Sequence, residues 1–304
     1  MLKQVARQPG RDESHMLEGK SAVITGASSG IGAALAGLMA TAGMKVILTG
    51  RRQEMLDAVA GKIRQEGGTA TVVCGDVTRR SEAEAMVQTC ISKHGSVDVL
   101  VNNAGRGHFG SVEDTTDEVI EHMFALNTFA LWYTTRPALR EMRRRGSGHI
   151  INVASMAGKV GYPYNSAYVA AKHACVGFTH ALRAELAETG IHATVVCPAG
   201  VMTEWANVTE GRPMLPFFSE SGPAVKRIAA ERGTALPPVE GVVSPERVAN
   251  AVLDCLRHPV AELYTHQGSE EFVKLMATDR ARAERYQLPV ILGEREVYER
   301  QERK

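Results

Sequence analysis

The sequence predicts a doubly wound α/β fold, in which helices cover both faces of a parallel sheet. Short apolar runs alternate with stretches of helical periodicity along most of the chain. Within these runs, apolar residues occupy consecutive positions rather than every second one, which indicates strands buried on both faces. Glycine provides 29 of the 304 residues and aromatic residues only 5%, which favours tight turns between strands and helices over a β-sandwich.

Seven apolar segments are expected to form the strands, with the helices between them. The expected strands are Ser21–Thr25, Lys45–Thr49, Ala70–Cys74, Val97–Val101, His149–Val153, His192–Val196 and Ala261–Thr265. The expected helices are Ile31–Ala42, Glu54–Glu66, Ser81–Lys93, Thr116–Arg144, Ser166–Glu188 and Ser244–His258. Because strands and helices alternate throughout, the sequence predicts a single domain with a seven-stranded parallel sheet.

Three segments fall outside this alternation. Residues 1–18 lack the apolar core of a secretory signal and are expected to form a flexible leader before the domain at residues 19–268. Within that domain, residues 203–243 are rich in proline, and we expect an irregular insertion that acts as a substrate lid. Residues 269–304 are rich in charged side chains and are expected to form a C-terminal extension, a solvated helix or pair of helices that lies on the domain.

The overall charge and the cysteine pattern exclude several classes of protein. Lys and Arg total 35 against 34 for Asp and Glu, whereas a nucleic-acid or anionic-membrane partner would favour a strong basic excess. No apolar stretch is long enough to span a membrane. The five cysteines show no C-x-x-C spacing and the histidines no H-E-x-x-H. This pattern predicts no metal site and is typical of a reducing, cytoplasmic compartment.

A glycine-rich turn follows the first expected strand and opens the first helix. It reads T-G-A-S-S-G-I-G from Thr25, with the spacing G-x-x-x-G-x-G. Such a turn aims free backbone N–H groups at a phosphate, although a merely tight turn would use the same glycines. The spacing resembles that of the short-chain dehydrogenase/reductase family, whose members have a Rossmann-type fold and bind a nicotinamide dinucleotide. The resemblance implies that the cofactor contacts Gly26, Ser28, Ser29, Gly30, Ile31 and Gly32.

The residues after the second strand bear on the choice of cofactor. NAD-specific sites carry a carboxylate there for the ribose 2′-hydroxyl, whereas NADP sites accommodate the 2′-phosphate with a cation. Here Arg51 and Arg52 follow Gly50, and the planar arginine side chain suits a phosphate. We therefore expect NADP(H). The alternative is that both arginines are solvated and both cofactors are used, and Ser29 stands where many NADP-dependent relatives carry a basic residue.

Three further segments match family motifs in the same order along the chain. A D-V pair closes the third strand, where the family binds adenine, and N-N-A-G closes the fourth, beside the adenosine site. P-A-G-V-M-T follows the sixth strand beside the nicotinamide, with Ala199 in place of the usual glycine. By resemblance, these segments supply cofactor contacts at Asp76, Val77, Asn103, Ala104, Gly105, Pro198, Gly200, Val201 and Thr203.

Four residues match the catalytic set of this family. Tyr168 and Lys172 are spaced i, i+4 and therefore share one face of a helix, a pattern that alone more often marks a surface pair. Ser155 follows the fifth strand, and Asn127 lies within the preceding long helix. All four residues match the family's Asn-Ser-Tyr-Lys tetrad in order, spacing and context.

The resemblance implies a role for each of the four. Tyr168 is the general acid when a ketone is reduced and the general base when an alcohol is oxidised. A free tyrosine titrates near ~10, and Lys172 is expected to lower that pKa. Lys172 also holds the nicotinamide ribose, so that Tyr168 and Lys172 both contact the cofactor. Ser155 hydrogen-bonds the substrate oxygen, and Asn127 supports a water chain that returns protons to Lys172.

The residues expected around the substrate are mostly apolar. They are Phe109, Met156, Val160, Tyr162, Tyr164, Met202, Trp205, Phe217 and Phe218. They favour a hydrophobic carbonyl or alcohol substrate, although the same aromatic residues could simply pack the lid. The resemblance also implies assembly as a homodimer or homotetramer through the two long helices at Thr116–Arg144 and Ser166–Glu188.

These observations lead to one preferred function and two alternatives. The preferred function is an NADP(H)-dependent oxidoreductase that interconverts a secondary alcohol and a ketone or aldehyde by hydride transfer. The first alternative keeps the chemistry but makes the protein a 3-oxoacyl-type reductase. The second is a non-catalytic NADPH-binding scaffold, which this fold can become, although the intact tetrad argues against it.

Overall fold

The protein is described here by a computed structural model that covers residues 16–303. Its central sheet has seven parallel strands in the order β3-β2-β1-β4-β6-β7-β9. The strands are β1 (Ser21–Thr25), β2 (Lys45–Gly50), β3 (Thr69–Cys74), β4 (Val99–Asn102), β6 (Gly148–Val153), β7 (Ile191–Cys197) and β9 (Glu262–Tyr264). Each lies within two residues of an expected strand, and the predicted doubly wound fold is confirmed.

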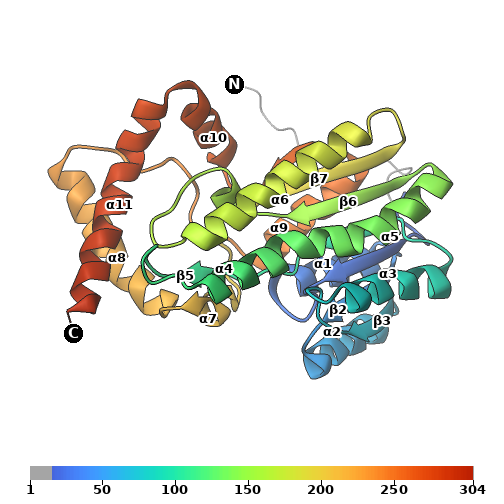
Figure 1. Ribbon diagram of the computed structural model, residues 1–304. Coiled ribbons are helices and arrows are strands. Elements are labelled where there is room, and N and C mark those ends of the chain that lie inside the picture. The colour runs from blue at the N-terminus through green and yellow to red at the C-terminus, as the bar shows by residue number, and fades with distance from the viewer. Residues whose placement is uncertain (1–15, 304) are drawn as a thin grey trace.

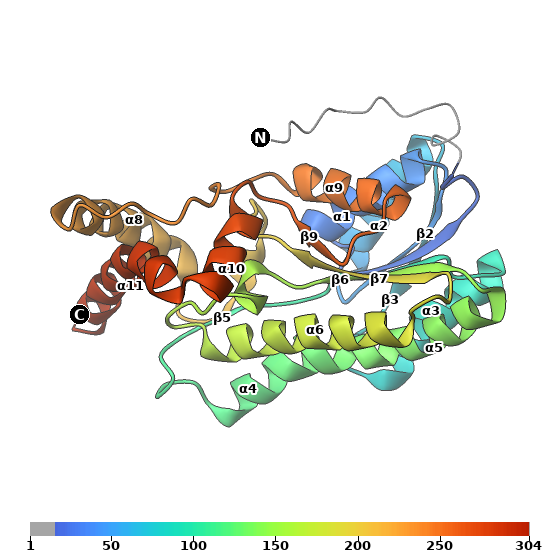
Figure 2. The same ribbon diagram turned by 90° about the horizontal axis from the view of Figure 1, so that it is seen from above.

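Helices cover both faces of this sheet (Figure 2). One face carries α1 (Gly30–Thr41), α2 (Gln53–Gln65) and α9 (Pro245–Arg257). The other face carries α3 (Arg80–His94), α4 (Asp117–Phe124), α5 (Ala130–Arg145) and α6 (Ser166–Glu185). Successive residues of a strand point to opposite faces, so that Ile24 packs in the core under α1 while Val23 packs in the core under α3 and α5.

The long helix expected at Thr116–Arg144 is divided by a single π-helical turn. The turn, η1 (Ala125–Phe129), joins α4 to α5 and contains Asn127. π-Helical turns inside α-helices frequently occur at functional sites. Here the turn lies beside the segment after β4, because the Asn127 side chain donates a hydrogen bond to the Arg106 carbonyl.

The expected irregular insertion is mainly helical, which corrects the prediction for residues 203–243. It contains α7 (Trp205–Val208) and β8 (Glu210–Gly211), which pairs with β5 (His108–Phe109), and then the 18-residue helix α8 (Met214–Glu231). Pro213 and Pro216 misled the prediction, because both lie at the start of α8, where a proline removes no helical hydrogen bond. The helix buries Met214 and Phe217.

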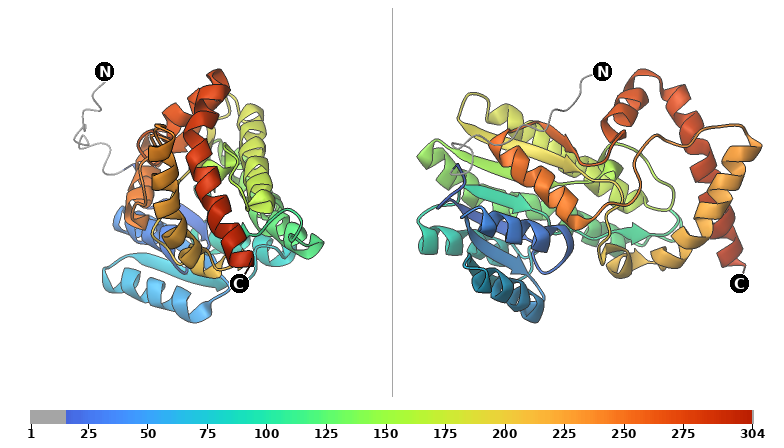
Figure 3. Two further views of the ribbon diagram at one scale, coloured as in Figure 1. Left: turned by 90° about the vertical axis from the view of Figure 1, so that its left-hand side faces the viewer. Right: turned by 180° about the vertical axis from the view of Figure 1, so that it is seen from behind.

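The C-terminal extension is also more integrated than expected. It forms α10 (Ser269–Thr278) and α11 (Arg280–Glu302), and α11 lies beside α8 at one end of the molecule, beyond the sheet (Figures 1 and 3). Val297 and Tyr298 of α11 are buried. The expectation of a solvated tail is therefore wrong for this face of α11, because its apolar residues are covered by α8 and by the segment after β4.

Most of the expected leader lies outside the described residues, which begin at Met16. Leu17, however, is 2% exposed and packs in the core under α1, so the ordered domain includes at least this residue. No helix in residues 16–303 has both the length and the apolar character to cross a membrane.

Candidate functional site

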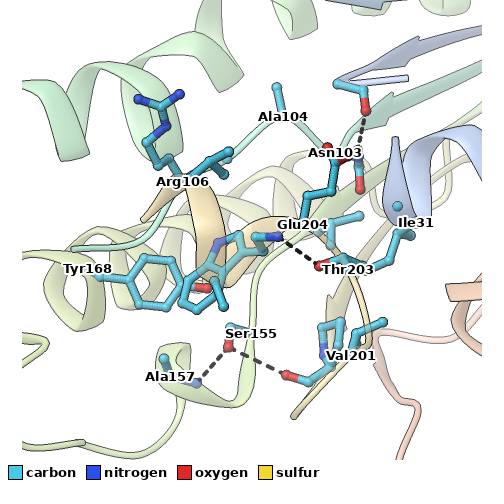
Figure 4. Close-up of a pocket in the computed structure, with 18 of the residues that line it drawn as sticks. Ile31, Asn103, Ala104, Arg106, Ser155, Ala157, Tyr168, Val201, Thr203 and Glu204 are labelled. Carbon is cyan, nitrogen blue, oxygen red and sulfur yellow. Dashed lines mark hydrogen bonds between the residues drawn. The ribbon is translucent and has the colours of Figure 1, made fainter. Parts of the chain in front are cut away.

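A cavity of about 710 Å³ lies at the carboxyl ends of the strands. In open α/β sheets, ligands usually bind at the carboxyl ends of the strands, at the point where the strand order reverses. Loops after β1, β2, β3, β4, β6 and β7 line the cavity, and α8 and α11 close its far end. Figure 4 shows the residues of its central part, with Asn103 and Ile31 on one side and Tyr168 on the other.

The glycine turn adopts a conformation that requires its glycines. Gly26 and Gly30 have φ of 66° and 55°, in the left-handed region that side chains disfavour. A Cβ on Gly32 would lie 2.4 Å from the Gly26 carbonyl oxygen. The N-terminus of α1 faces the cavity through Gly30 and Ile31, and the Ser29 side chain does not cap it. Its free N–H groups and the helix dipole therefore fit an anionic group such as a pyrophosphate.

The segment after β4 is tied directly to this turn. The backbone N–H groups of Asn103 and Ala104 both donate to the Thr25 hydroxyl at 3.0 Å, and the Asn103 amide donates to the Thr25 carbonyl at 2.9 Å. Gly105 continues the cavity wall. By contrast, Asn102 points into the protein and donates to Asn152 at 2.8 Å, so it stabilises the sheet.

The Arg52 side chain contacts the glycine turn, where a residue that binds a cofactor phosphate would have to lie. Its guanidinium donates to the Ser28 and Ser29 hydroxyls at 3.0 and 2.7 Å and pairs with Glu204 at 3.0 Å. Arg51 lies 3.8 Å from Asp76. No carboxylate directly follows β2, and both arginines line the cavity.

Asp76 and Val77 also line the cavity. The Asp76 carboxylate accepts hydrogen bonds from the Thr78 N–H and hydroxyl at 2.9 and 2.8 Å. Partial burial raises the pKa of Asp76, but the Thr78 hydrogen bonds and the Arg51 charge outweigh it and hold the pKa below its usual value. Asp76 is therefore an ionised hydrogen-bond acceptor at the edge of the cavity.

The loop after β7 brings Pro198, Gly200, Val201 and Thr203 to the opposite wall. A residue that the sequence analysis missed, His266, holds this loop. Its Nδ1 accepts from the Ala199 N–H at 3.2 Å, and its Nε2 lies 2.8 Å from the Gly200 carbonyl oxygen. Because Nδ1 accepts, the proton resides on Nε2, which donates to Gly200. No local sequence pattern identifies His266, because it follows the last strand and lies 66 residues along the chain from Gly200, the loop residue that it contacts.

Tyr168 and Lys172 form a buried pair rather than a surface pair. Their side chains are 8% and 4% exposed, and the Lys172 Nζ lies 5.7 Å from the centre of the Tyr168 ring. Lys172 also donates to the Val153 carbonyl at 2.9 Å. Ser155 caps the short helix η2 (Met156–Gly158): its hydroxyl accepts from the Ala157 N–H at 3.1 Å and faces the Pro198 carbonyl at 3.4 Å (Figure 4).

Asn127 completes this group from the π-helical turn. Its Nδ2 donates to the Arg106 and Met123 carbonyls at 3.0 and 3.1 Å, whereas its buried Oδ1 has no hydrogen-bond partner among the described residues. A Cβ on Gly105 would lie 2.8 Å from this Oδ1 and 3.2 Å from the Lys172 Nζ. The missing side chain of Gly105 thus leaves a space, faced by an acceptor and a donor, that suits a bridging water.

The pKa of Tyr168 is determined mainly by the burial of its side chain. Burial raises this pKa, and a hydrogen bond with Ser155 lowers it in part. Burial also lowers the pKa of Lys172. The expected lowering of the Tyr168 pKa by Lys172 is not found, because Lys172 is not among the groups that shift this pKa and desolvation disfavours the phenolate. The phenol therefore keeps its proton at neutral pH, as a general acid requires.

The far end of the cavity is mostly apolar, as the sequence analysis expected. Trp205 lies against Tyr168 with 5.3 Å between ring centres. The other expected residues that line the cavity are Phe109, Met156, Tyr162, Met202, Phe217 and Phe218. Two expectations are wrong: Val160 packs in the core beneath α10, and Tyr164 stacks on Tyr298 with 3.8 Å between ring centres. The sequence analysis missed Arg106, Asn165, Met214 and Glu294, which also line the cavity.

Comparison with known proteins agrees with this geometry. Residues 20–212 match the short chain dehydrogenase family. The chain belongs to this family. It is 34% identical to the ketoacyl reductase HetN of Nostoc sp. over 263 residues, which are 86% of this chain and 84% of that protein. It is 40% identical to the D-beta-hydroxybutyrate dehydrogenase of Cupriavidus necator, over 62% of this chain and 73% of that protein.

Solved structures of other short-chain dehydrogenases have the same fold. A short-chain dehydrogenase/reductase from Burkholderia phymatum in complex with NAD matches with a TM-score of 0.74 and 27% identity, over 87% of this chain and 95% of that one. A variant of actinorhodin polyketide ketoreductase with NADPH matches with a TM-score of 0.67 and 32% identity, over 81% and 95%. This short-chain dehydrogenase thus has structural neighbours described with either cofactor.

Proposed function

We propose that this short-chain dehydrogenase is an NADP(H)-dependent oxidoreductase that interconverts a secondary alcohol and a ketone or aldehyde. The observation that carries the proposal is the buried Tyr168–Lys172 pair, which lies with Ser155 between an apolar pocket and a glycine turn. A phenol that is 8% exposed and faces a cavity is positioned for proton transfer to a bound carbonyl. The same buried tetrad argues against a non-catalytic scaffold.

In ketone reduction, the Tyr168 hydroxyl donates its proton to the substrate oxygen, while the Ser155 hydroxyl donates a hydrogen bond to that oxygen and stabilises its developing charge. The bound nicotinamide supplies the hydride, and the protein supplies position and charge. Lys172 holds the nicotinamide ribose and stabilises the Tyr168 phenolate. A water between Asn127 Oδ1 and Lys172, in the space at Gly105, returns the proton. In alcohol oxidation Tyr168 acts as the base.

The preference for NADP(H) rests on Arg51 and Arg52. Arg52 already contacts two hydroxyls of the glycine turn, and guanidinium groups bind phosphates through paired hydrogen bonds. Asp76 and the segments after β4 and β7 surround the adenosine and nicotinamide ends. Of the two structural neighbours, one is described with NADPH and the other with NAD.

The substrate is a hydrophobic carbonyl or alcohol, bound against Trp205, Phe109 and Phe217 under a lid formed by residues 203–243. A 3-oxoacyl-type reductase is the second candidate, favoured by the ketoacyl reductases of Nostoc and of Streptomyces coelicolor, to which the chain is 34% and 37% identical. The protein works in the cytoplasm as a homodimer or homotetramer. Phe129 at the end of η1 and Trp132 on α5 support this assembly, because they are 48% and 37% exposed.

The test is a comparison of wild type and Tyr168→Phe in the oxidation of NADPH and NADH with a panel of ketones. We expect NADPH to be preferred, apolar ketones to be reduced best, and Tyr168→Phe to lose at least about 100-fold in kcat while it still binds NADPH. Retained turnover in Tyr168→Phe would refute the mechanism, and better turnover with NADH would refute the cofactor preference.

A further inference from the structure

Glu294 places a carboxyl group in the wall of the substrate end of the cavity. It comes from α11 and lines the same cavity as Tyr168, Ser155 and Trp205. Val297 and Tyr298, three and four residues later on the same helix face, are buried in the domain. An acid at an inward position of a helix contradicts the local apolar pattern, and such exceptions concentrate at functional sites.

This carboxyl group has no partner in the part of the chain that the structure describes. Burial alone raises the pKa of Glu294 to about 7, and no hydrogen bond or neighbouring cation offsets it. An uncompensated buried carboxylate is costly, so the protein is less stable with it than with an apolar residue. A bound molecule that donates a hydrogen bond would remove that cost.

The other charged side chains of the cavity wall are engaged elsewhere. Arg106 lies 3.4 Å from Glu210, Arg52 pairs with Glu204, and Arg51 lies near Asp76. Lys172 donates to the Val153 carbonyl. The titratable group that faces Glu294 is Tyr162, from the loop after β6. Tyr162 is 37% exposed, but desolvation of its hydroxyl in the cavity wall and the Glu294 charge raise its pKa, so the phenol stays neutral.

Tyr162 interacts electrostatically with both Glu294 and Tyr168. It is close enough to Tyr168 to act on the pKa of that residue, and Glu294 acts on Tyr162. Tyr168, Tyr162 and Glu294 line the same cavity, and Glu294 comes from α11. A substrate whose carbonyl oxygen meets Tyr168 would have to extend toward α11 to reach Glu294.

The position of the carboxyl group is fixed by packing on both sides of it. Gly293 lets α11 approach α8 so closely that a Cβ there would lie 2.7 Å from the Val225 nitrogen. Tyr298 stacks on Tyr164, and its hydroxyl accepts a hydrogen bond from the Ser111 N–H at 2.9 Å. Glu294 lies between Gly293 and Tyr298 on a helix that these contacts hold in place. A side chain that binds a substrate group needs such a fixed position.

We propose that Glu294 binds a hydrogen-bond donor of the substrate, a hydroxyl or ammonium group remote from the reacting carbonyl, and disfavours a carboxylate at that place. This inference rests on the proposed function and specifies its substrate class: an apolar ketone or alcohol with a distal donor.

The test uses methyl ketones of graded chain length that end in methyl, hydroxyl, ammonium or carboxylate. Wild type, Glu294→Gln and Glu294→Leu are assayed with NADPH at about pH 8, where the Glu294 carboxyl is largely ionised. Glu299→Gln, an exposed position on the same helix, is the control. We expect wild type to prefer a donor-ended ketone, and Glu294→Gln to lower kcat/KM for the donor-ended ketone about 10- to 100-fold relative to the methyl-ended ketone, mainly through KM.

A second readout does not depend on turnover. Because the folded pKa of Glu294 is raised above its ordinary value of 4.5 to about 7, the folded protein binds the extra proton, and stability is lost as pH rises through this window. Glu294→Gln should melt with a weaker pH dependence than wild type, and Glu299→Gln should not.

The outcomes separate this inference from the proposed function. If wild type reduces the methyl-ended ketones but shows the same terminal-group preference as Glu294→Gln, the inference is wrong and the oxidoreductase proposal stands. Preference for the carboxylate-ended ketone in wild type would also overturn it. If no ketone is reduced at any chain length, the proposed function fails and the inference fails with it.

Discussion

Gly105 shows how the absence of one side chain creates a functional space. Asn127 Oδ1 and Lys172 Nζ both face the position that its Cβ would occupy, and Oδ1 has no other hydrogen-bond partner in residues 16–303. A buried acceptor of this kind normally binds a protein group or an ordered water. The glycine is needed here for room, since its backbone φ is not in the left-handed region.

Gly105→Ala should therefore lower kcat about tenfold or more, because the methyl group displaces the water that returns protons to Lys172. The KM for NADPH and the melting temperature should change little by comparison. Steady-state kinetics and thermal melting measure these effects. Gly61→Ala in α2, where a Cβ would meet nothing within 4 Å, is the control and should keep full activity. Unchanged kcat in Gly105→Ala would exclude the relay.

The proposed preference for NADP(H) depends on Arg52, also at the scale of single residues. Its guanidinium is held beside the glycine turn by the Ser28 and Ser29 hydroxyls and by Glu204. Arg52→Ala should raise the KM for NADPH about tenfold or more, since hydrogen bonds to charged groups contribute about 1.5–3 kcal/mol, and should leave the KM for NADH nearly unchanged. Arg143→Ala, an exposed residue at the end of α5, is the matched control. Equal effects on both cofactors would contradict the assignment.

At the scale of secondary-structure elements, the packing of α8 against α11 determines the shape of the apolar end of the cavity. The two helices meet at Gly293, whose missing side chain lets the backbone of α11 contact Val225. α8 brings Met214 and Phe217 to the cavity and α11 brings Glu294. This end of the cavity is therefore closed by a helical pair rather than a loop, and its shape depends on how closely the two helices approach.

Gly293→Ala should destabilise this pair by about 1–3 kcal/mol, because the overpacking cost exceeds the gain of up to about 1 kcal/mol in helix propensity. The loss should be local: hydrogen exchange in α8 and α11 should rise, and kcat/KM for the preferred ketone should fall. Gly222→Ala in α8, where a Cβ meets nothing within 4 Å, makes the same chemical change and should stabilise the helix. Equal exchange in the two variants would contradict this packing.

His149 joins two strands in the middle of the molecule and affects its stability as a whole. It lies on β6, is 5% exposed, and its Nε2 is 2.9 Å from the Thr194 hydroxyl on β7. Burial, together with the nearby His192 and Arg183, lowers the pKa of His149 to about 3. The imidazole is therefore neutral in the folded protein over most of the pH range in which the unfolded chain binds a proton.

The protein should accordingly lose stability as pH falls from about 6.5 toward 3, because the unfolded chain takes up the proton first. His149 alone accounts for on the order of 4 kcal/mol across that window. Urea unfolding at a series of pH values measures the slope, which His149→Gln should reduce. His173→Gln, on the exposed side of α6, should keep it. A slope equal to wild type in His149→Gln would refute the assignment to His149.

The sheet and the cofactor turn could be predicted from sequence because their signals are local. Each strand is a short apolar run. The glycines of the turn are required by contacts within a few residues, as Gly32 is by the nearby Gly26 carbonyl. Tyr168 and Lys172 are four residues apart on one helix, so their proximity follows from helix geometry. Ser155 and Asn127 required the family resemblance, since they come from other elements.

What only the tertiary structure decided is the substrate end. Prolines in residues 203–243 predicted an irregular segment, yet Pro213 and Pro216 lie at the start of α8 and the helix continues through Pro223. The charges of residues 269–304 concealed the apolar face of α11. His266 and Glu294 reach the site from residues far along the chain and leave no local pattern. The sequence by itself determined the sheet and the proximity of Tyr168 and Lys172 on one helix. The shape and polarity of the substrate end depend on long-range contacts between helices, which local periodicity does not encode.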